Sequence, residues 1–341
     1  MRKLFPILLA LLFTMQTMAY SQKKALLVGV SQYPQESGWS HINSENDIEI
    51  LDKVLNNRGF SVDILFGSNA TYQNITDKLE KIAESVQSGD TLLIHFSCHG
   101  QQMLALNDSL EPDGLDESII PYDAQSSYSN SYKGDKHLKD DIISSYIEEI
   151  ANRIGDYGLV VVTIDACHSD EMNRAYDEKT DDTTIIRGTD AIFDYGITLT
   201  PDMEVQLRQC EHHDTLFRIE KTGADIIYIS ACRSDEKNYE CVIDGIGYGS
   251  LSYCIYDLLN NNPTDLGMEM ALDSLYIKMK RFGRQHMITR NTLGYKPKEP
   301  SLPPPPPPRP CFLEIVKKHW IAFSVVAISS VVLLYLIWRK K

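Results

Sequence analysis

The chain has 341 residues, of which 43% are hydrophobic, and a formal net charge of −14 at pH 7. This length and apolar content suffice for one large domain with a sizeable core. The acidic balance disfavours nucleic acid as a partner and favours cationic partners or divalent cations, with a solvated acidic surface that binds no partner as the alternative.

The first 21 residues have the pattern of a secretory signal peptide. Two basic residues at positions 2 and 3 precede an apolar stretch over residues 4–13, and a small-residue site ends at Ser21. This pattern predicts cleavage after Ser21. We therefore expect residues 1–21 to take no part in the fold.

Residues 22–296 show alternating strand and helix patterns, which define one domain. Short apolar runs predict strands near residues 24–30, 60–66, 91–97, 159–165 and 224–231. Amphipathic periodicity predicts helices over residues 44–57, 72–87, 140–154, 249–260 and 267–281. The alternation implies an α/β fold with a mostly parallel sheet and helices on both of its faces.

The C-terminal end of the chain reads as a membrane anchor on a stiff spacer. Residues 297–310 form a proline-rich linker with six consecutive prolines, and residues 311–318 form a juxtamembrane segment. Residues 319–338 are long and apolar enough for a single transmembrane helix, and the basic tail 339–341 favours the cytoplasmic side. We therefore expect a single-pass cell-membrane protein with an extracytoplasmic domain, in the periplasm if the source is bacterial.

A histidine and a cysteine each follow a predicted buried strand directly. The run Thr91–Ser97 leads to His99, and the run Leu159–Asp165 leads to Cys167. In an open parallel sheet, ligands bind outside the carboxyl ends of the strands. The imidazole and the thiol would share one crevice there, as a cysteine nucleophile and its base require.

Five motifs in the domain agree in order and spacing with a known family. They are Asn46-Asp47, His99-Gly100, the run from Glu111 to Asp123, Asp165-Ala166-Cys167-His168-Ser169, and Ile229-Ser230-Ala231-Cys232. Over residues 23–281 the chain resembles the metacaspase branch of the caspase-like cysteine peptidases. The resemblance implies a caspase-like α/β sheet flanked by helices and the activity of a cysteine endopeptidase, a thiol protease that hydrolyses peptide bonds.

The resemblance also assigns roles to the two strand-end residues. It makes Cys167 the nucleophile and His99 the general base that later protonates the leaving amine. The backbone N–H groups of Gly100 and Cys167 would form the oxyanion hole. The alternative is that both side chains are bystanders on the loops of a flavodoxin-like domain.

By the same resemblance, Asp47, Ser97 and Asp165 line the pocket for the side chain that precedes the scissile bond. Paired carboxylates suit a guanidinium or ammonium group and repel aspartate, so cleavage after Arg or Lys is expected. Asp47 also fits a helix-capping box that begins at Ser44, and the two roles are compatible.

Calcium is the one cofactor that the resemblance suggests. The matching acidic positions are Asp116, Asp140 and Asp141, whose hard oxygen ligands suit this cation. Asp140 and Asp141 also begin a predicted helix, where acids cap N–H groups without any metal.

The weakly periodic stretch 168–222 is the expected place for self-processing. It carries several basic residues in a strip expected to be exposed, and we predict cleavage there after Lys179 or Arg187. An uncut lid over the crevice is the alternative.

The sequence thus predicts a membrane-tethered, monomeric peptidase that acts on proteins or peptides with basic residues. Two other interpretations stay open: a catalytically silent caspase-like adaptor that binds basic peptides, and a clostripain- or legumain-like peptidase of the same clan. The intact pair of His99 and Cys167 favours an enzyme, and the segment from Asp113 to Glu117 favours the metacaspase branch.

Overall fold

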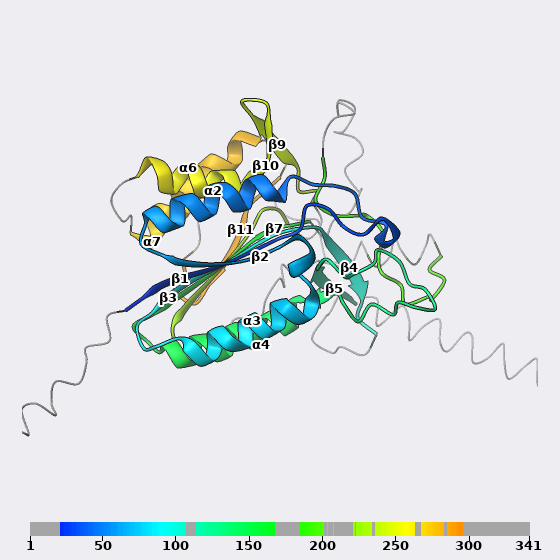
Figure 1. Ribbon diagram of the computed structural model, residues 1–341, viewed down its shortest axis with the longest axis horizontal. Helices are drawn as coiled ribbons and strands as arrows, with labels where there is room; N and C mark the ends of the chain where they lie inside the picture. The colour runs from blue at the N-terminus through cyan, green and yellow to red at the C-terminus, as the bar shows by residue number, and fades with distance from the viewer. Residues whose placement is uncertain are drawn as a thin grey trace, which may run out of the picture.

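The computed structural model describes residues 21–106, 114–167, 185–200, 203, 207, 221, 223–233, 236–262, 267–282 and 285–295. Within these residues, a six-stranded sheet in the order β11-β8-β7-β3-β1-β2 forms the centre of the molecule. Helices cover both faces of the sheet (Figure 1). All neighbours in the sheet pair in parallel except β11, which runs antiparallel to β8 at the edge. The predicted α/β architecture with a mostly parallel sheet is confirmed.

The five parallel strands lie where the apolar runs predicted them. They are β1 (Lys23–Gly29), β2 (Ser61–Phe66), β3 (Thr91–Ser97), β7 (Leu159–Asp165) and β8 (Asp225–Ser230). The sequence pattern missed six shorter strands: β4 (Gly100–Leu104), β5 (Leu115–Ile119), β6 (Leu138–Lys139), β9 (Glu240–Ile243), β10 (Ile246–Gly249) and β11 (Ile288–Asn291). Strands β4, β5 and β6 form one small sheet, and β9 and β10 form a hairpin.

The predicted helices begin and end within two residues of their expected bounds. Helices α2 (Ser44–Asn57), α6 (Ser250–Asn261) and α7 (Met268–Met279) lie on one face of the sheet, and α3 (Tyr72–Ser85) and α4 (Asp140–Ile154) lie on the other (Figure 1). Three short 3-10 helices connect other elements: η1 (Gln35–Ser37), η2 (Gly67–Asn69) and η4 (Lys280–Phe282).

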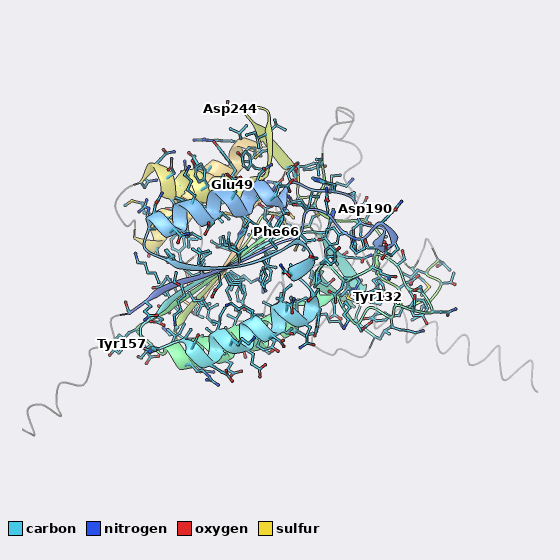
Figure 2. All side chains as sticks on the ribbon, viewed as in Figure 1. Glu49, Phe66, Tyr132, Tyr157, Asp190 and Asp244 are labelled. Atoms are coloured by element: carbon cyan, nitrogen blue, oxygen red, sulfur yellow. The ribbon has the colours of Figure 1, made fainter. Side chains whose placement is uncertain are left out.

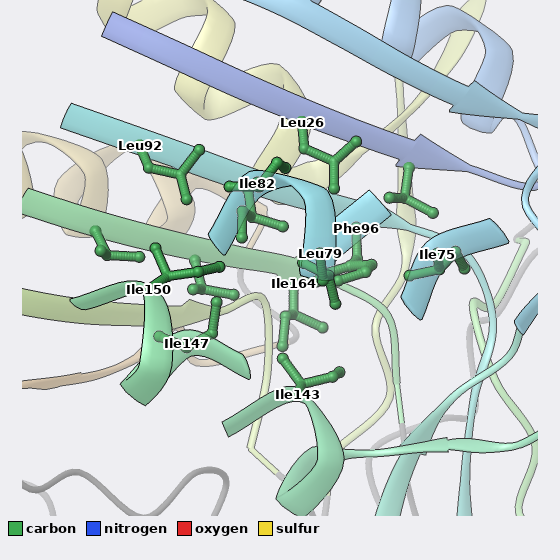
Figure 3. Close-up of a cluster of buried hydrophobic side chains, with 14 of the residues drawn as sticks. Leu26, Ile75, Leu79, Ile82, Leu92, Phe96, Ile143, Ile147, Ile150 and Ile164 are labelled. Atoms are coloured by element: carbon green, nitrogen blue, oxygen red, sulfur yellow. The ribbon is translucent and has the colours of Figure 1, made fainter. Parts of the chain in front are cut away.

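An apolar layer fills the space between the sheet and helices α3 and α4 (Figure 3). Leu79 on α3 and Ile147 on α4 are fully buried against the strand residues of this layer, such as Phe96. Helix α3 begins cleanly because the Thr71 side chain accepts a hydrogen bond from the backbone N–H of Asn74. Each fully buried side chain of this kind stabilises the fold by about 1.5–3 kcal/mol.

The carboxyl ends of the parallel strands form a second, polar region. Ser97 ends β3 and Asp165 ends β7, and the two are paired in the parallel register. Figure 2 shows Asp190 on this side of the molecule, near β4 and β5, and Tyr157, which precedes β7, at the opposite end. The edge of the sheet at which ligands bind in such folds is therefore built from buried polar residues.

Within the described residues, the structure contains no helix of sufficient length and apolarity to cross a membrane. The predicted linker 297–310, juxtamembrane segment 311–318, transmembrane segment 319–338 and tail 339–341 lie outside these residues, as does the predicted signal peptide apart from Ser21.

Candidate functional site

Three side chains predicted to bind a cationic substrate group meet at the polar edge. Ser97 and Asp165 are the last residues of the adjacent strands β3 and β7, and Asp47 lies in the first turn of α2. The Ser97 hydroxyl donates to Asp47 Oδ2 at 2.8 Å, and the Gly249 N–H donates to Asp47 Oδ1 at 2.9 Å. The structure therefore brings Asp47, Ser97 and Asp165 together.

Asp165 is fixed by donors to both of its carboxylate oxygens. Asn238 Nδ2 donates to Oδ1 at 2.7 Å, and the backbone N–H and hydroxyl of Ser252 donate to Oδ2 at 2.7 and 2.6 Å. Burial raises the pKa of this carboxyl, but Arg187 and these donors outweigh burial and hold the pKa below its ordinary value. Asp165 is therefore a buried carboxylate that stays ionised.

His95 supports Asp165 from behind. Its Nε2 lies 3.1 Å from the Ser252 hydroxyl, and its Nδ1 lies 2.7 Å from the Thr163 hydroxyl. Burial lowers the pKa of His95 to about 4, so the ring is neutral near pH 7. Both ring nitrogens of His95 contact hydroxyl groups, so this histidine supports the site and is not the base for Cys167.

Arg187 occupies the centre of the acidic side chains, and the expectation that it lies in an exposed strip is wrong. Its side chain is 0% exposed. Nη2 lies 2.8 Å from Asp47 Oδ2 and 2.9 Å from Glu240 Oε1, while Nη1 lies 2.8 Å from Ser97 Oγ and 3.9 Å from Asp165 Oδ1. Three buried carboxylates require a cation, and Arg187 supplies it. We call Asp47, Ser97, Asp165 and Glu240 the guanidinium site.

Glu240 was missed by the sequence analysis. It begins β9 and is held by Asn43, whose backbone N–H donates to Glu240 Oε1 at 2.7 Å and whose side-chain amide donates to Oε2. Strand β9 has four residues and no strong periodicity, and Glu240 belongs to none of the motifs. No local signal pointed to this residue.

The backbone around Arg187 is held like an added strand. The Arg187 N–H donates to Asn238 O at 3.0 Å, and the Glu240 N–H donates to Ile185 O at 3.0 Å. On its other side, the segment forms a parallel bridge between Gly188 and Gly100. The segment 185–188 therefore lies extended between β4 and the residues that lead into β9.

The Arg187 carbonyl points at two backbone donors. Its oxygen accepts from the Cys167 N–H at 2.8 Å and from the Gly100 N–H at 3.3 Å. Gly188 follows so closely that a Cβ there would lie 2.2 Å from Cys167 O. The two N–H groups that the sequence analysis expected to bind an oxyanion thus converge on one carbonyl oxygen.

His99 is oriented by its ring contacts. Its Nε2 lies 2.9 Å from Ser40 O, and the ring stacks on Trp39 at 5.0 Å between centroids, with an interplanar angle of 25°. A carbonyl oxygen only accepts hydrogen bonds, so Nε2 carries the proton and Nδ1 has the free lone pair. Burial lowers the pKa of His99 to about 4, and among the described groups Nδ1 has no hydrogen-bond partner. The ring is therefore a neutral base at pH 7.

The Cys167 thiol donates to Glu236 O at 2.9 Å, so the predicted pair of Cys167 and His99 is not joined by a hydrogen bond in this structure. Catalytic hydrogen bonds commonly tighten only when substrate is bound. Cys98 and Cys232, two further thiols near this edge, are poor nucleophiles. Burial raises the pKa of Cys98 to about 12, and a hydrogen bond to Cys167, ahead of burial, raises the pKa of Cys232 well above its ordinary value.

The three expected calcium ligands have other roles in this structure. Asp116 is buried and its carboxylate forms an ion pair with Lys139, while Asp140 and Asp141 occupy the first turn of α4. Acids in a first helical turn interact favourably with the helix dipole. In the part of the chain that the structure describes, no group of three or more His, Cys, Asp or Glu side chains could hold a metal ion. We therefore assign calcium no step in the chemistry, and a calcium requirement stays a prediction.

Lys179 lies outside the described residues, as do His168 and most of the stretch 168–222. Of the two predicted cleavage positions, the structure therefore describes only Arg187.

Comparisons with known proteins agree with this architecture. A Metacaspase-1 from Lodderomyces elongisporus is 22% identical over 302 residues, which cover 79% of this chain and 64% of that protein. A Metacaspase-1 from Mycosarcoma maydis is 23% identical and covers 80% of this chain and 72% of its own length. The chain thus spans slightly less than two thirds of the first of these relatives.

A solved structure shows the same fold. The protein GSU0716 from Geobacter sulfurreducens superposes with a TM-score of 0.52 at 21% identity, covering 79% of this chain and 93% of that one. Together with the family match that follows, this likeness confirms the predicted caspase-like α/β fold. The sequence profile of the caspase domain matches residues 22–290, which is more than half of the chain. The chain therefore belongs to the caspase-domain family of cysteine peptidases, with metacaspases among its relatives.

Proposed function

We propose that this protein is a cysteine endopeptidase that cleaves after Arg or Lys and processes itself at the bond between Arg187 and Gly188. The observation that carries the proposal is the binding mode of Arg187. Its side chain fills the guanidinium site while its carbonyl oxygen accepts from the N–H groups of Gly100 and Cys167. This is the placement that a substrate residue needs before its peptide bond is attacked.

The backbone contacts support the same reading. A peptide bound beside a sheet edge gains affinity from main-chain hydrogen bonds and specificity from its side chains. Arg187 and Ile185 make those main-chain bonds with Asn238 and Glu240. A substrate in trans would replace the segment 185–188 and use the same partners.

The reaction follows from the groups at the site. The Cys167 thiol gives its proton to His99 Nδ1, and Sγ bonds to the carbonyl carbon of Arg187. Negative charge on the carbonyl oxygen is stabilised by the N–H groups of Gly100 and Cys167. His99 then protonates the nitrogen of Gly188 as the C–N bond breaks, leaving a thioester. Water, deprotonated by His99, releases the Arg187 carboxylate and restores the thiol.

Mass spectrometry of the full chain tests the proposal. We expect the wild type to yield fragments that end at Arg187 and begin at Gly188, and Cys167→Ala to remain uncut at this bond. Arg187→Gln should also stay uncut there, whereas the matched change Lys179→Gln should not prevent the cut. An uncut wild type that hydrolyses peptides after Arg would refute self-processing. A chain that is neither cut nor able to hydrolyse peptides after Arg or Lys would favour the silent adaptor.

The membrane anchor and the compartment are further proposals, carried by the sequence of residues outside the described part. We propose an extracytoplasmic domain tethered by residues 319–338 and working as a monomer, with proteins or peptides rich in basic residues as substrates. Calcium dependence rests on the family resemblance alone. Peptide hydrolysis measured with a chelator, and again after calcium is added in excess of the chelator, tests it.

A further inference from the structure

The two terminal nitrogens of Arg187 are bound on separate sides of the guanidinium site. Nη1 contacts Ser97 and lies near Asp165, whereas Nη2 lies between Asp47 and Glu240. Nε of Arg187 has no hydrogen-bond partner among the described groups. Recognition of the side chain therefore depends on the two Nη groups alone.

Glu240 is built into this site rather than drawn to it by chance. Its side chain is 3% exposed, and both of its oxygens accept hydrogen bonds from Asn43, across 197 residues of sequence. Glu240 Oε1 accepts from the Asn43 N–H and from Arg187 Nη2 at once. Asn43, which directly precedes α2, holds the carboxylate in place. Glu240 would therefore keep its position after Arg187 leaves and could bind the cationic group of another substrate.

Space for the planar guanidinium depends on a glycine. A Cβ at Gly249 would lie 2.6 Å from Arg187 Nη1 and 2.2 Å from Asp165 Oδ2. Those separations are too short for any real contact, so only glycine at this position leaves room for Nη1 beside Asp165. The site thus fits a planar guanidinium with two terminal nitrogens.

A lysine side chain satisfies only one end of the site. Its ammonium is a single nitrogen, while the guanidinium presents two nitrogens in a rigid plane. An ammonium beside Asp47 and Glu240 would leave Ser97 Oγ without the donor that Nη1 supplies and Asp165 without its nearby cation. The reverse placement would leave Glu240 without its charged donor, with only the Asn43 contacts remaining. Buried acceptors that lose a charged donor cost binding free energy. We infer that the protein is selective for arginine over lysine before the scissile bond, and that Glu240 is a residue that determines this selectivity.

This inference rests on the proposed function, and peptide kinetics separate the two. We would measure kcat/KM for paired peptides that differ only in Arg or Lys before the cleaved bond. We expect the wild type to prefer Arg by roughly 10- to 100-fold. Glu240→Gln should lower this ratio about tenfold, mainly through KM, because Arg loses a charge-assisted contact that Lys shares less fully. The matched change Glu49→Gln, on the exposed side of α2, should leave the ratio unchanged (Figure 2).

Self-processing gives a second readout within the chain. Arg187→Lys should slow the cut by at least about tenfold, and the same change in a Glu240→Gln background should slow it less, because the two side chains act through one contact. Equal slowing in both backgrounds would overturn the role of Glu240. Hydrolysis of Arg and Lys peptides at equal rates by the wild type would overturn the selectivity alone. Hydrolysis of neither would overturn the proposed function itself.

Discussion

Two fully buried regions of this domain are stabilised in opposite ways. The layer between the sheet and helices α3 and α4 is apolar. Leu79, Phe96 and Ile147 belong to this one cluster and have no exposed surface (Figure 3). The guanidinium site at the end of the same strands buries three carboxylates around one guanidinium. The two regions share strands β3 and β7, so one set of elements supports both.

The energetic difference between these regions has a functional meaning. Burial of apolar surface stabilises the fold by about 25 cal/mol per Å², so the apolar layer is explained by stability alone. Burying charges costs several kcal/mol per ion, which their mutual attraction only partly offsets, so a buried ionic cluster is weak evidence for stability. A site with more carboxylates than cations is better suited to binding a cationic residue than to holding the fold together.

The largest expected effect is a loss of catalytic activity that leaves the stability of the fold nearly unchanged. Cys167→Ala and His99→Ala should each lower kcat for peptides cleaved after Arg by at least about 10³-fold, because the thiol and the imidazole act as one proton-transfer unit. The midpoint of urea unfolding should change little for Cys167→Ala, since the apolar layer is untouched. Peptide kinetics and urea titration on the same preparations measure both quantities.

Cys98 provides the matched control for this prediction. It precedes His99, is buried and belongs to the apolar layer, so Cys98→Ala should retain measurable hydrolysis. Turnover by a folded Cys167→Ala protein at the wild-type rate would show that another group is the nucleophile.

The two regions also differ in how far the sequence alone predicted them. The bounds of α3 and α4 follow from apolar residues at helical spacing, a local signal within one element. Asp47, Ser97 and Asp165 were predicted through the family motifs. The placement of Arg187 was not, because its partners lie far away in the chain, with Glu240 53 residues further along. Hydrogen bonds over such separations leave no local pattern.

The short strands were missed for a related reason. Strands β9 and β11 have four residues each, and their residues are mostly half-buried or exposed, so no apolar period develops. Their positions are set by what they pair with, β10 and β8 respectively. These strands, and Glu240, which β9 contributes to the guanidinium site, required the three-dimensional structure.

The second prediction reverses the first by weakening the apolar layer. Leu79→Ala should lower the free energy of unfolding by about 2–5 kcal/mol, because the cavity left in a closely packed layer collapses only in part. The folded fraction should still cleave after Arg with an unchanged kcat, since Leu79 lies in the apolar layer and contributes nothing to the guanidinium site. Urea unfolding and peptide kinetics at low temperature measure the two effects.

Ile277 is the matched control for this change. It lies on α7 with 63% of its side chain exposed, so Ile277→Ala should alter the free energy of unfolding by less than about 0.5 kcal/mol. A loss of peptide hydrolysis in folded Leu79→Ala would contradict the separation of the two regions.

The smallest expected effect concerns acid, and it singles out the polar side of the domain. Burial lowers the pKa of His95 and His99 to about 4 and that of His137 to about 3, all below the ordinary value of about 6.5. Between pH 6.5 and 4, the unfolded chain therefore binds more protons at these histidines than the folded chain does. These histidines should therefore lower the free energy of unfolding as the pH falls through this window, by at most about 3 kcal/mol for each. Asp47 opposes part of this loss, because burial raises its pKa to about 6.

Urea unfolding at several pH values between 7 and 4 measures this slope, and one substitution shows which region causes it. His137 is buried between the Tyr132 hydroxyl and Gln101 Oε1, at 2.8 Å from each. His137→Gln removes one titrating ring, so the slope against pH should become shallower, whereas the same change at the exposed His41 should leave it as it was. An unaltered slope in His137→Gln would show that this ring does not cause the acid sensitivity. Asp165 cannot take its place in this range, because its pKa lies below its ordinary value and its contribution is lost only at still lower pH.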